Sequence, residues 1–160
     1  MPLRIRPARP GEAGLVLSLI RELAEYEKLA DKVDATEAMV EEALFAQGST
    51  TRCDFAEWDG ELAGQAIWFT NFSTFRGRSG LYLEDLYVRP AFRGRGIGRA
   101  LLGRLARECQ ERGWPRMEWV VLDWNKPAID FYRSLGANLA EDWRLCRLDG
   151  EALAALAAGG

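Results

Sequence analysis

Hydrophobic and polar positions in the first third of the chain predict one strand followed by two helices. Leu3–Arg6 alternates and ends at Pro7, as a first strand would. A helix is expected over residues 11–26, where these apolar residues recur at helical spacing: Leu15, Leu19, Leu23 and Tyr26, with Val16 and Ile20 beside them. Thr36 is suited to cap a second helix. That helix is expected to bury Met39, Val40, Leu44 and Phe45.

The middle of the chain predicts a β-hairpin and a further strand. Thr51–Trp58 and Glu61–Phe69 have the residue pattern of strands, and Asp59-Gly60 between them favours a tight turn. Residues 71–80 are expected to form a long loop that is rich in aromatic residues. Leu81–Val88 is the next predicted strand.

The last part of the chain predicts alternating helices and strands after a glycine-rich turn. The helix that follows this turn is expected to end near Glu111. The further strands are predicted at Met117–Leu122 and Trp143–Leu148, and the further helices at Asn125–Leu135 and Glu151–Ala158. The order β-α-α-β-β-β-α-β-α-β predicts an α/β fold, a mixed sheet covered by helices, in a single domain over residues 1–160.

Composition narrows the chemistry that this domain can perform. The chain of 160 residues has no histidine, which excludes Ser-His-Asp and Cys-His catalysis and argues against a metal site. Acid–base chemistry must then come from carboxylates, tyrosines, cysteines, lysines or water. A net charge of −3 argues against nucleic acid as a partner and is compatible with a small cationic substrate.

The cysteines and the termini indicate a cytoplasmic protein. Cys53, Cys109 and Cys146 are too few and too widely spaced for a disulfide framework, and we expect them to be small buried side chains. No apolar run reaches the roughly 18 residues of a membrane span. The first residues lack the apolar stretch of a signal peptide. No membrane partner is expected.

The stretch Arg93–Gly98, Arg-Gly-Arg-Gly-Ile-Gly, carries the strongest chemical signal. Glycines let the backbone turn tightly, and the N–H groups at the start of the following helix favour an anion such as phosphate. The spacing is that of neither a P-loop nor a dinucleotide fingerprint, because Arg99 and Ala100 follow the last glycine. An ordinary glycine-rich connection is the alternative interpretation.

The spacing Arg-x-x-Gly-x-Gly at Arg93, Gly96 and Gly98 resembles the pyrophosphate loop of the GCN5-related N-acetyltransferase family. The resemblance covers nearly the whole chain. Motifs at residues 82–85, 122–125 and 131–137 are similar to the diamine (spermidine/spermine) acetyltransferase branch. Residues 71–75 and 121–125 resemble its thialysine-acetylating relatives in particular.

The resemblance implies this family's fold and acetyl-coenzyme A as the cofactor. Backbone groups of one strand would pair with the pantetheine arm, the loop would hold the pyrophosphate, and the start of a later helix would line the acetyl end. The implied cofactor residues are Leu86, Tyr87, Val88, Arg93, Gly94, Arg95, Gly96, Ile97, Gly98, Arg99, Asn125, Lys126 and Pro127.

The resemblance also implies acetylation of the primary amine of a small cationic molecule, a thialysine- or lysine-like amino acid or a diamine or polyamine. Tyr132 matches the family's general acid, and Glu84 matches its acidic substrate site. The other implied substrate residues are Tyr26, Glu27, Asp85, Trp119 and an acid before Trp143, either Glu141 or Asp142. A homodimer is implied, with the C-terminal strand region contributing across the interface.

The chemistry of acetyl transfer gives these residues distinct roles. An ammonium has no lone pair, so the amine must lose a proton, and Glu84 is the best candidate to receive it directly or through water. Tyr132 would protonate the departing thiolate, and the backbone N–H of Leu86 or Tyr87 would stabilise the oxyanion. Structural alternatives are an ion pair or solvated strand edge for the acids, a core position for Tyr132, and a helix N-cap for Asn125.

Two departures from the branch disfavour spermidine and spermine as natural substrates. Residues 71–75 are Asn-Phe-Ser-Thr-Phe where diamine-specific members carry Asp-Pro-Trp, and the segment before Trp143 is shortened. Two other functions stay open. One is a non-catalytic module that senses acyl-coenzyme A, and the other is an N-acetyltransferase acting on proteins or peptides.

Overall fold

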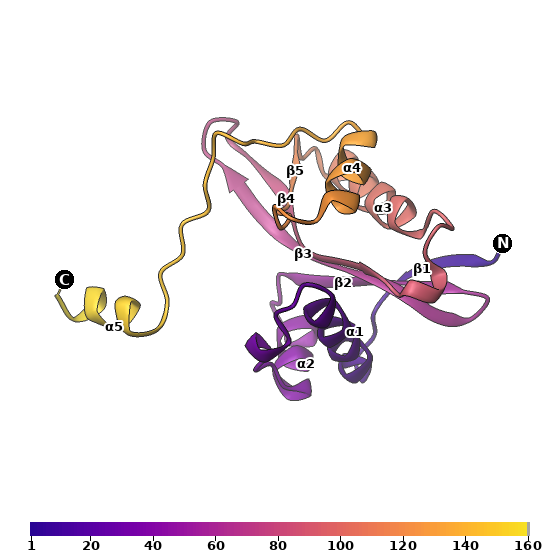
Figure 1. Cartoon of the computed structure of the whole chain (residues 1–160), viewed down its shortest axis with the longest axis horizontal. Coiled ribbons are helices and arrows are strands. Elements are labelled where there is room, and N and C mark those ends of the chain that lie inside the picture. Colours follow the sequence, from indigo (N-terminus) through magenta and orange to yellow (C-terminus); the bar gives the residue numbers. More distant parts are fainter. Residues whose placement is uncertain (160) are drawn as a thin grey trace. The chain divides into compact units, whose positions relative to one another are not determined.

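The computed structural model describes residues 1–159 and separates into two compact units, residues 1–120 and the residues from Val121 onward. The first unit contains a five-stranded sheet with the order β1-β2-β3-β4-β5 (Figure 1). Its strands are β1 (Leu3–Pro7), β2 (Thr51–Trp58), β3 (Glu61–Ser73), β4 (Arg78–Val88) and β5 (Met117–Glu118). Neighbours are antiparallel except β4 and β5, which are parallel. The predicted α/β class with a mixed sheet is confirmed.

Three helices cover the sheet within the first unit. Helices α1 (Ala13–Tyr26) and α2 (Glu37–Phe45) pack on one face, and α3 (Ile97–Arg112) packs on the other (Figure 1). Short 3-10 turns, η1 (Ala30–Lys32) and η2 (Pro90–Phe92), follow α1 and β4. In this arrangement Glu22, near the C-terminal end of α1, contacts Tyr87 and Arg89 at the end of β4.

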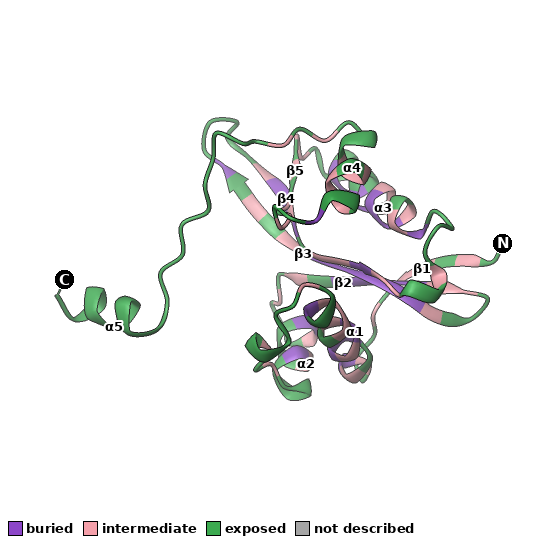
Figure 2. Cartoon of the chain, in the orientation of Figure 1, coloured by how far each residue is buried: buried purple, intermediate pink, exposed green. Residues whose placement is uncertain are grey.

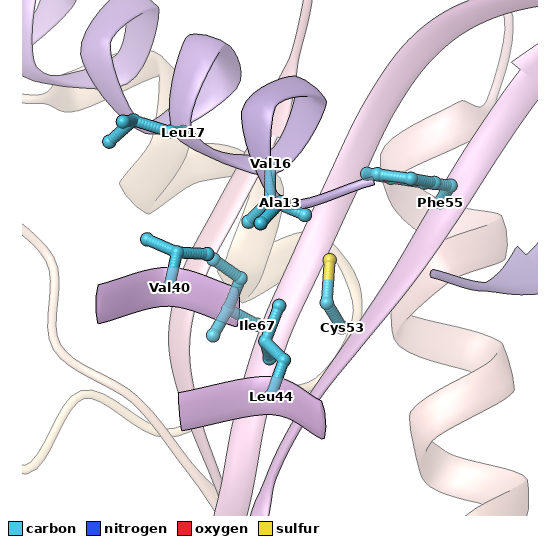
Figure 3. Close-up of a cluster of buried hydrophobic side chains, with 8 residues drawn as sticks. All are labelled: Ala13, Val16, Leu17, Val40, Leu44, Cys53, Phe55 and Ile67. Carbon is cyan, nitrogen blue, oxygen red and sulfur yellow. The ribbon is translucent and has the colours of Figure 1, made fainter. Parts of the chain in front are cut away.

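The core under α1 and α2 is a small apolar cluster. Its side chains come from both helices and from β2 and β3: Ala13, Val16, Leu17, Val40, Leu44, Cys53, Phe55 and Ile67 (Figure 3).

The predicted cap at Thr36 is confirmed, since its Oγ1 accepts a hydrogen bond of 3.2 Å from the Met39 N–H.

Three residues expected in helix cores are instead exposed, namely Leu15, Tyr26 and Met39. Figure 2 shows that both α1 and α2 carry buried and exposed positions. In α1 the buried stripe is formed by Ala13, Val16, Leu17, Leu19 and Ala24. This helix is apolar on more than one side, so its own periodicity does not determine which side meets the sheet.

The segment predicted as an aromatic loop is a continuation of the hairpin. Pairs run from Asn71 opposite Gly80 to Ser73 opposite Arg78, and only residues 74–77 form the turn. Long strands are favoured here because each added pair satisfies more backbone groups. Conversely, β5 ends at Glu118 and not at Leu122, because its pairing with β4 stops after Tyr82.

The second unit contains α4 (Lys126–Ser134) and α5 (Gly150–Gly159). The predicted strand at Trp143–Leu148 is wrong, because these residues have no regular structure. Trp143 is 78% exposed and Leu145 is 67% exposed. A strand needs a partner for its backbone groups, and none of the strands in residues 1–159 pairs with this segment. Cys146 lies in the same segment and is exposed, whereas Cys53 and Cys109 are buried as expected.

The helices of residues 1–159 are all too short or too polar to traverse a bilayer.

Candidate active site

The glycine-rich loop has the backbone conformation that its sequence predicts. Gly94 and Gly96 have φ angles of 76° and 77°, a left-handed region that side chains disfavour. Gly96 is the N-cap of α3, and no side chain caps that helix end. Ile97 is buried and anchors the loop to the core. The first backbone N–H groups of α3 therefore have no side-chain acceptor, a suitable arrangement for binding an anion.

Two arginines of this loop lie on aromatic rings. The Arg93 Cζ is 5.2 Å from the centroid of the Tyr26 ring and 5.8 Å from that of Tyr87. The Arg95 Cζ lies 5.0 Å from the Trp58 ring centroid. Stacking of this kind holds a guanidinium in place while leaving its N–H groups available at the rim.

One edge of β4 has no neighbouring strand beyond Tyr82 among the described residues. Residues Leu86, Tyr87 and Val88 pair with β3 on one side. On the other side, β5 pairs only with Leu81 and Tyr82, so no strand among the described residues borders the rest of that edge. The edge is thus open to an extended ligand that could add to the sheet.

A β-bulge lies at Glu84. Asp85 stands opposite Ile67 and Leu83 stands opposite Trp68, so Glu84 is an extra residue on β4. A bulge of this type redirects side chains and increases the local twist, and such bulges are frequent beside active sites. The sequence does not predict this bulge, because nothing in the local residue pattern fixes the register between β3 and β4.

Three carboxylates interact at this bulge. Burial, together with the charges of Glu84 and Glu27, raises the pKa of Asp85 to about 6. Burial also raises the pKa of Glu27. Glu84 itself is exposed. The charge of Glu27, which follows α1, thus acts on Asp85 of β4, and Glu84 is the exposed acid of the three.

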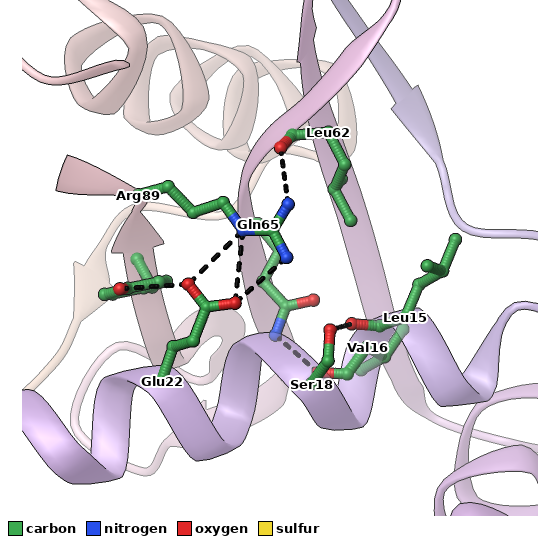
Figure 4. Close-up of polar contacts among 8 residues, drawn as sticks. Leu15, Val16, Ser18, Glu22, Leu62, Gln65 and Arg89 are labelled. Carbon is green, nitrogen blue, oxygen red and sulfur yellow. Dashed lines mark hydrogen bonds and ion pairs between the residues drawn. The ribbon is translucent and has the colours of Figure 1, made fainter. Parts of the chain in front are cut away.

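Polar contacts tie α1 to the end of β4 beside this cluster (Figure 4). Arg89 pairs with Glu22 over 2.9 Å between Nη2 and Oε2, and the Tyr87 hydroxyl donates to Glu22 over 3.3 Å. Deeper in the core, the Gln65 Nε2 donates to the Val16 carbonyl oxygen over 3.1 Å. These contacts attach α1, which ends at Tyr26, to β3 and to the end of β4, the strand that carries Glu84 and Asp85.

The remaining predicted cofactor residues lie at the start of α4 in the second unit. Asn125 is buried, and its Oδ1 accepts a hydrogen bond of 3.4 Å from the Ala128 N–H, which confirms the N-cap alternative. Lys126 forms an ion pair of 2.6 Å with Asp130, and Pro127 lies in the first turn.

The other predicted catalytic and substrate residues lie in different surroundings. Tyr132 is half-buried in α4, with its ring centroid 5.5 Å from that of Phe131. Glu141 is exposed and lies 3.5 Å from Arg133. Trp119, half-buried in the first unit, directly follows β5.

Comparison with known proteins decides the family. The model of the acetyltransferase (GNAT) family matches residues 17–137. The chain belongs to this family. As a GNAT protein it is an N-acetyltransferase, an enzyme that transfers acetyl groups to amines, and the family uses acetyl-coenzyme A as the acyl donor.

Individual relatives support the resemblance found in the sequence. This acetyltransferase is 40% identical to a thialysine N-epsilon-acetyltransferase of Bos taurus, with 96% of each chain covered. It is 42% identical to an L-ornithine N5-acetyltransferase of Arabidopsis thaliana over 59% of its own length and 42% of that protein. Its structure matches an integron cassette protein from the mobile metagenome of V. cholerae with a TM-score of 0.82, 27% identity and 98% coverage of both chains. The resemblance to the thialysine-acetylating group is thus confirmed.

Proposed function

We propose that this acetyltransferase acts on the side-chain amine of a small cationic amino acid of the thialysine or lysine type. The observation that carries the proposal is the bulge at Glu84, an exposed acid whose charge, with that of Glu27, acts on the neighbouring Asp85. Negative charge concentrated at one place attracts a cationic amine and raises its local concentration. The names of the bovine and plant relatives, which act on thialysine and ornithine, favour an amino acid over a polyamine.

The proposed cofactor fits the residues that are present. The glycine-rich loop and the uncapped start of α3 would hold the pyrophosphate, with Arg93 and Arg95 adding positive charge. The open edge of β4 at Leu86, Tyr87 and Val88 would hold the extended arm through backbone hydrogen bonds. Asn125, Lys126 and Pro127 would line the acetyl end. Acetyl-coenzyme A supplies the activated acetyl thioester.

Proton transfers are assigned to two side chains. Glu84 accepts the proton of the ammonium, directly or through water, so that the amine nitrogen gains a lone pair for direct attack. Tyr132 holds a proton at Oη and gives it up to the departing sulfur. A backbone N–H of Leu86 or Tyr87 donates to the developing oxyanion. Tyr26, Asp85, Glu27, Trp119 and Glu141 are the proposed substrate contacts.

We also propose a homodimer in which the C-terminal segment contacts a second copy. Trp143, Leu145 and Leu148 are exposed apolar residues close together in the sequence, and such groups mark interaction surfaces. Sedimentation equilibrium should give twice the monomer mass. A variant with Trp143→Ser and Leu145→Ser should shift toward monomer, and a wild-type chain that sediments as a monomer would contradict the proposal.

The function is tested by coenzyme A release with a panel of amines. The panel contains thialysine, lysine, ornithine, spermidine and a lysine-containing peptide, each at matched concentration with acetyl-coenzyme A. We expect the highest kcat/KM with thialysine or another amino acid. A strong preference for spermidine or for the peptide would overturn the substrate assignment. Binding of acetyl-coenzyme A without turnover of any amine would instead support a sensor module.

A further inference from the structure

Arg93 belongs to the cofactor loop, the glycine-rich loop Arg93–Gly98 that we propose holds the cofactor. It nevertheless contacts Tyr26, which we propose as part of the amine site together with Glu27, Glu84 and Asp85. Its guanidinium stacks on Tyr26, which ends α1, and on Tyr87 of β4, at centroid distances of 5.2 and 5.8 Å. Its Nε donates to the Val88 carbonyl oxygen over 3.0 Å. The guanidinium is therefore held by two aromatic rings and by the hydrogen bond of its Nε.

The two Nη groups of Arg93, unlike its Nε, make no hydrogen bond or ion pair within residues 1–159. Arg93 is exposed, so these groups can meet an anion while the faces of the guanidinium stay on the aromatic rings.

We propose that Arg93 is a positioning residue that couples the cofactor loop to the amine site, an inference that rests on the proposed function. Tyr26 immediately precedes Glu27, whose charge acts on Asp85. Stacking on Tyr26 therefore helps to hold the Tyr26-Glu27 segment beside the acids of β4. An anion at the Nη groups fixes the guanidinium and so strengthens that stacking.

Coupling of this kind must be reciprocal. If coenzyme A raises the affinity for the amine, the amine raises the affinity for coenzyme A by the same factor. A single exposed cation–π contact corresponds to a factor of about two to five in affinity.

Arg95 offers a matched control from the same loop. Its guanidinium lies on Trp58 and Phe92, at 5.0 and 5.5 Å, and these residues belong to β2 and to η2, not to α1. Replacement of Arg95 also removes one positive charge from the loop, but it leaves the contact between Arg93 and Tyr26 intact. A loss of charge alone would therefore affect both variants alike.

The test is calorimetric titration of thialysine with and without saturating coenzyme A, for wild type, Arg93→Met and Arg95→Met. Coenzyme A allows no turnover, and its concentration is raised until each variant is saturated. In wild type we expect coenzyme A to tighten thialysine binding about two- to five-fold. The ratio should fall to about one in Arg93→Met and persist in Arg95→Met. A wild-type ratio of one, or an unchanged ratio in Arg93→Met, would overturn the coupling.

A double-mutant cycle in thermal unfolding checks the contact without any ligand. Arg93→Met and Tyr26→Leu should be non-additive in their effect on Tm, whereas Arg95→Met and Tyr26→Leu should be additive. Additivity in the first pair would refute the stacking.

The outcomes separate the two proposals. Turnover of amines with an unchanged Arg93→Met ratio rejects the coupling alone. No turnover, with a ratio that depends on Arg93, rejects the proposed function alone. Failure of wild type to bind thialysine rejects the assignment of this amine and the coupling together.

Discussion

Burial and the charge of the adjacent Glu84 raise the pKa of Asp85 to about 6, and the charge of Glu27 adds to the effect. The two strand residues are adjacent in sequence, but a regular strand would direct them to opposite faces of the sheet. The bulge changes this alternation. The exposed Glu84 therefore directly precedes an acid whose pKa is raised, at a point where the regular alternation of β4 is interrupted.

The raised pKa of Asp85 makes stability depend on pH. Its folded-state value of about 6 lies above the ordinary 3.8, so the folded protein keeps a proton that the unfolded chain releases in this window. Stability therefore falls as pH rises between these values, by about 1–3 kcal/mol. Asp85→Asn should lack this fall. Urea unfolding of both proteins across the window checks the expectation, and parallel pH curves would refute it.

Glu12 should show the opposite dependence. Hydrogen bonds from Arg6 lower the pKa of Glu12 from 4.5 to about 2, so the ion pair stabilises the fold fully above the ordinary pKa and is lost as pH falls toward 2. Glu12→Gln should cost about 1–2 kcal/mol at neutral pH, and the difference should shrink on acidification. Asp31→Asn, which removes the exposed pair with Lys32, is the control and should change little. Equal effects of both substitutions would contradict the account.

Gly64 should be intolerant of a side chain. A Cβ at this position would overlap the carbonyl oxygen of Tyr87 and stand 3.2 Å from the Val88 Cα. Gly64→Ala should therefore lower the free energy of unfolding by about 1–3 kcal/mol and raise KM for acetyl-coenzyme A. Gly103→Ala in α3 meets no close backbone atom and should be neutral or stabilising by up to about 1 kcal/mol. Urea unfolding measures both, and a neutral Gly64→Ala would show that the strands separate easily.

Tyr132→Phe removes only the hydroxyl that we assign as proton donor. Coenzyme A release at saturating substrates should fall about 100-fold or more, with little change in KM for the amine. Tyr87→Phe is the matched control, because its hydroxyl binds Glu22 and has no assigned part in the reaction. If Tyr132→Phe keeps the wild-type kcat, another group or water protonates the thiolate.

Features that depend on a few neighbouring residues could be predicted from the sequence. The Asp59-Gly60 turn has φ angles of 49° and 85°, as the two-residue hairpin chemistry requires. The caps at Thr36 and Asn125 and the left-handed glycines of the glycine-rich loop are equally local. The family resemblance then indicated acetyl-coenzyme A, the acyl donor that the family uses.

Features that depend on distant partners could not be predicted. The bulge at Glu84 arises from the register of β3 against β4, which the alternating pattern of β4 does not specify. The Trp143–Leu148 segment has the residues of a strand but lacks a pairing strand among the described residues. Exposure of Leu15 likewise depends on which side of an apolar helix meets the sheet.

The central claim is that Glu84 accepts the proton of the amine, and Glu84→Gln tests it most directly. Glutamine keeps the size and the position in the bulge but cannot take up the proton. The measurement is kcat for coenzyme A release with thialysine, at saturating acetyl-coenzyme A and neutral pH. We expect Glu84→Gln to lower kcat by about 100-fold or more, in the range of general-base catalysis. A kcat within about two-fold of wild type, too small a change for loss of a general base, would contradict the account.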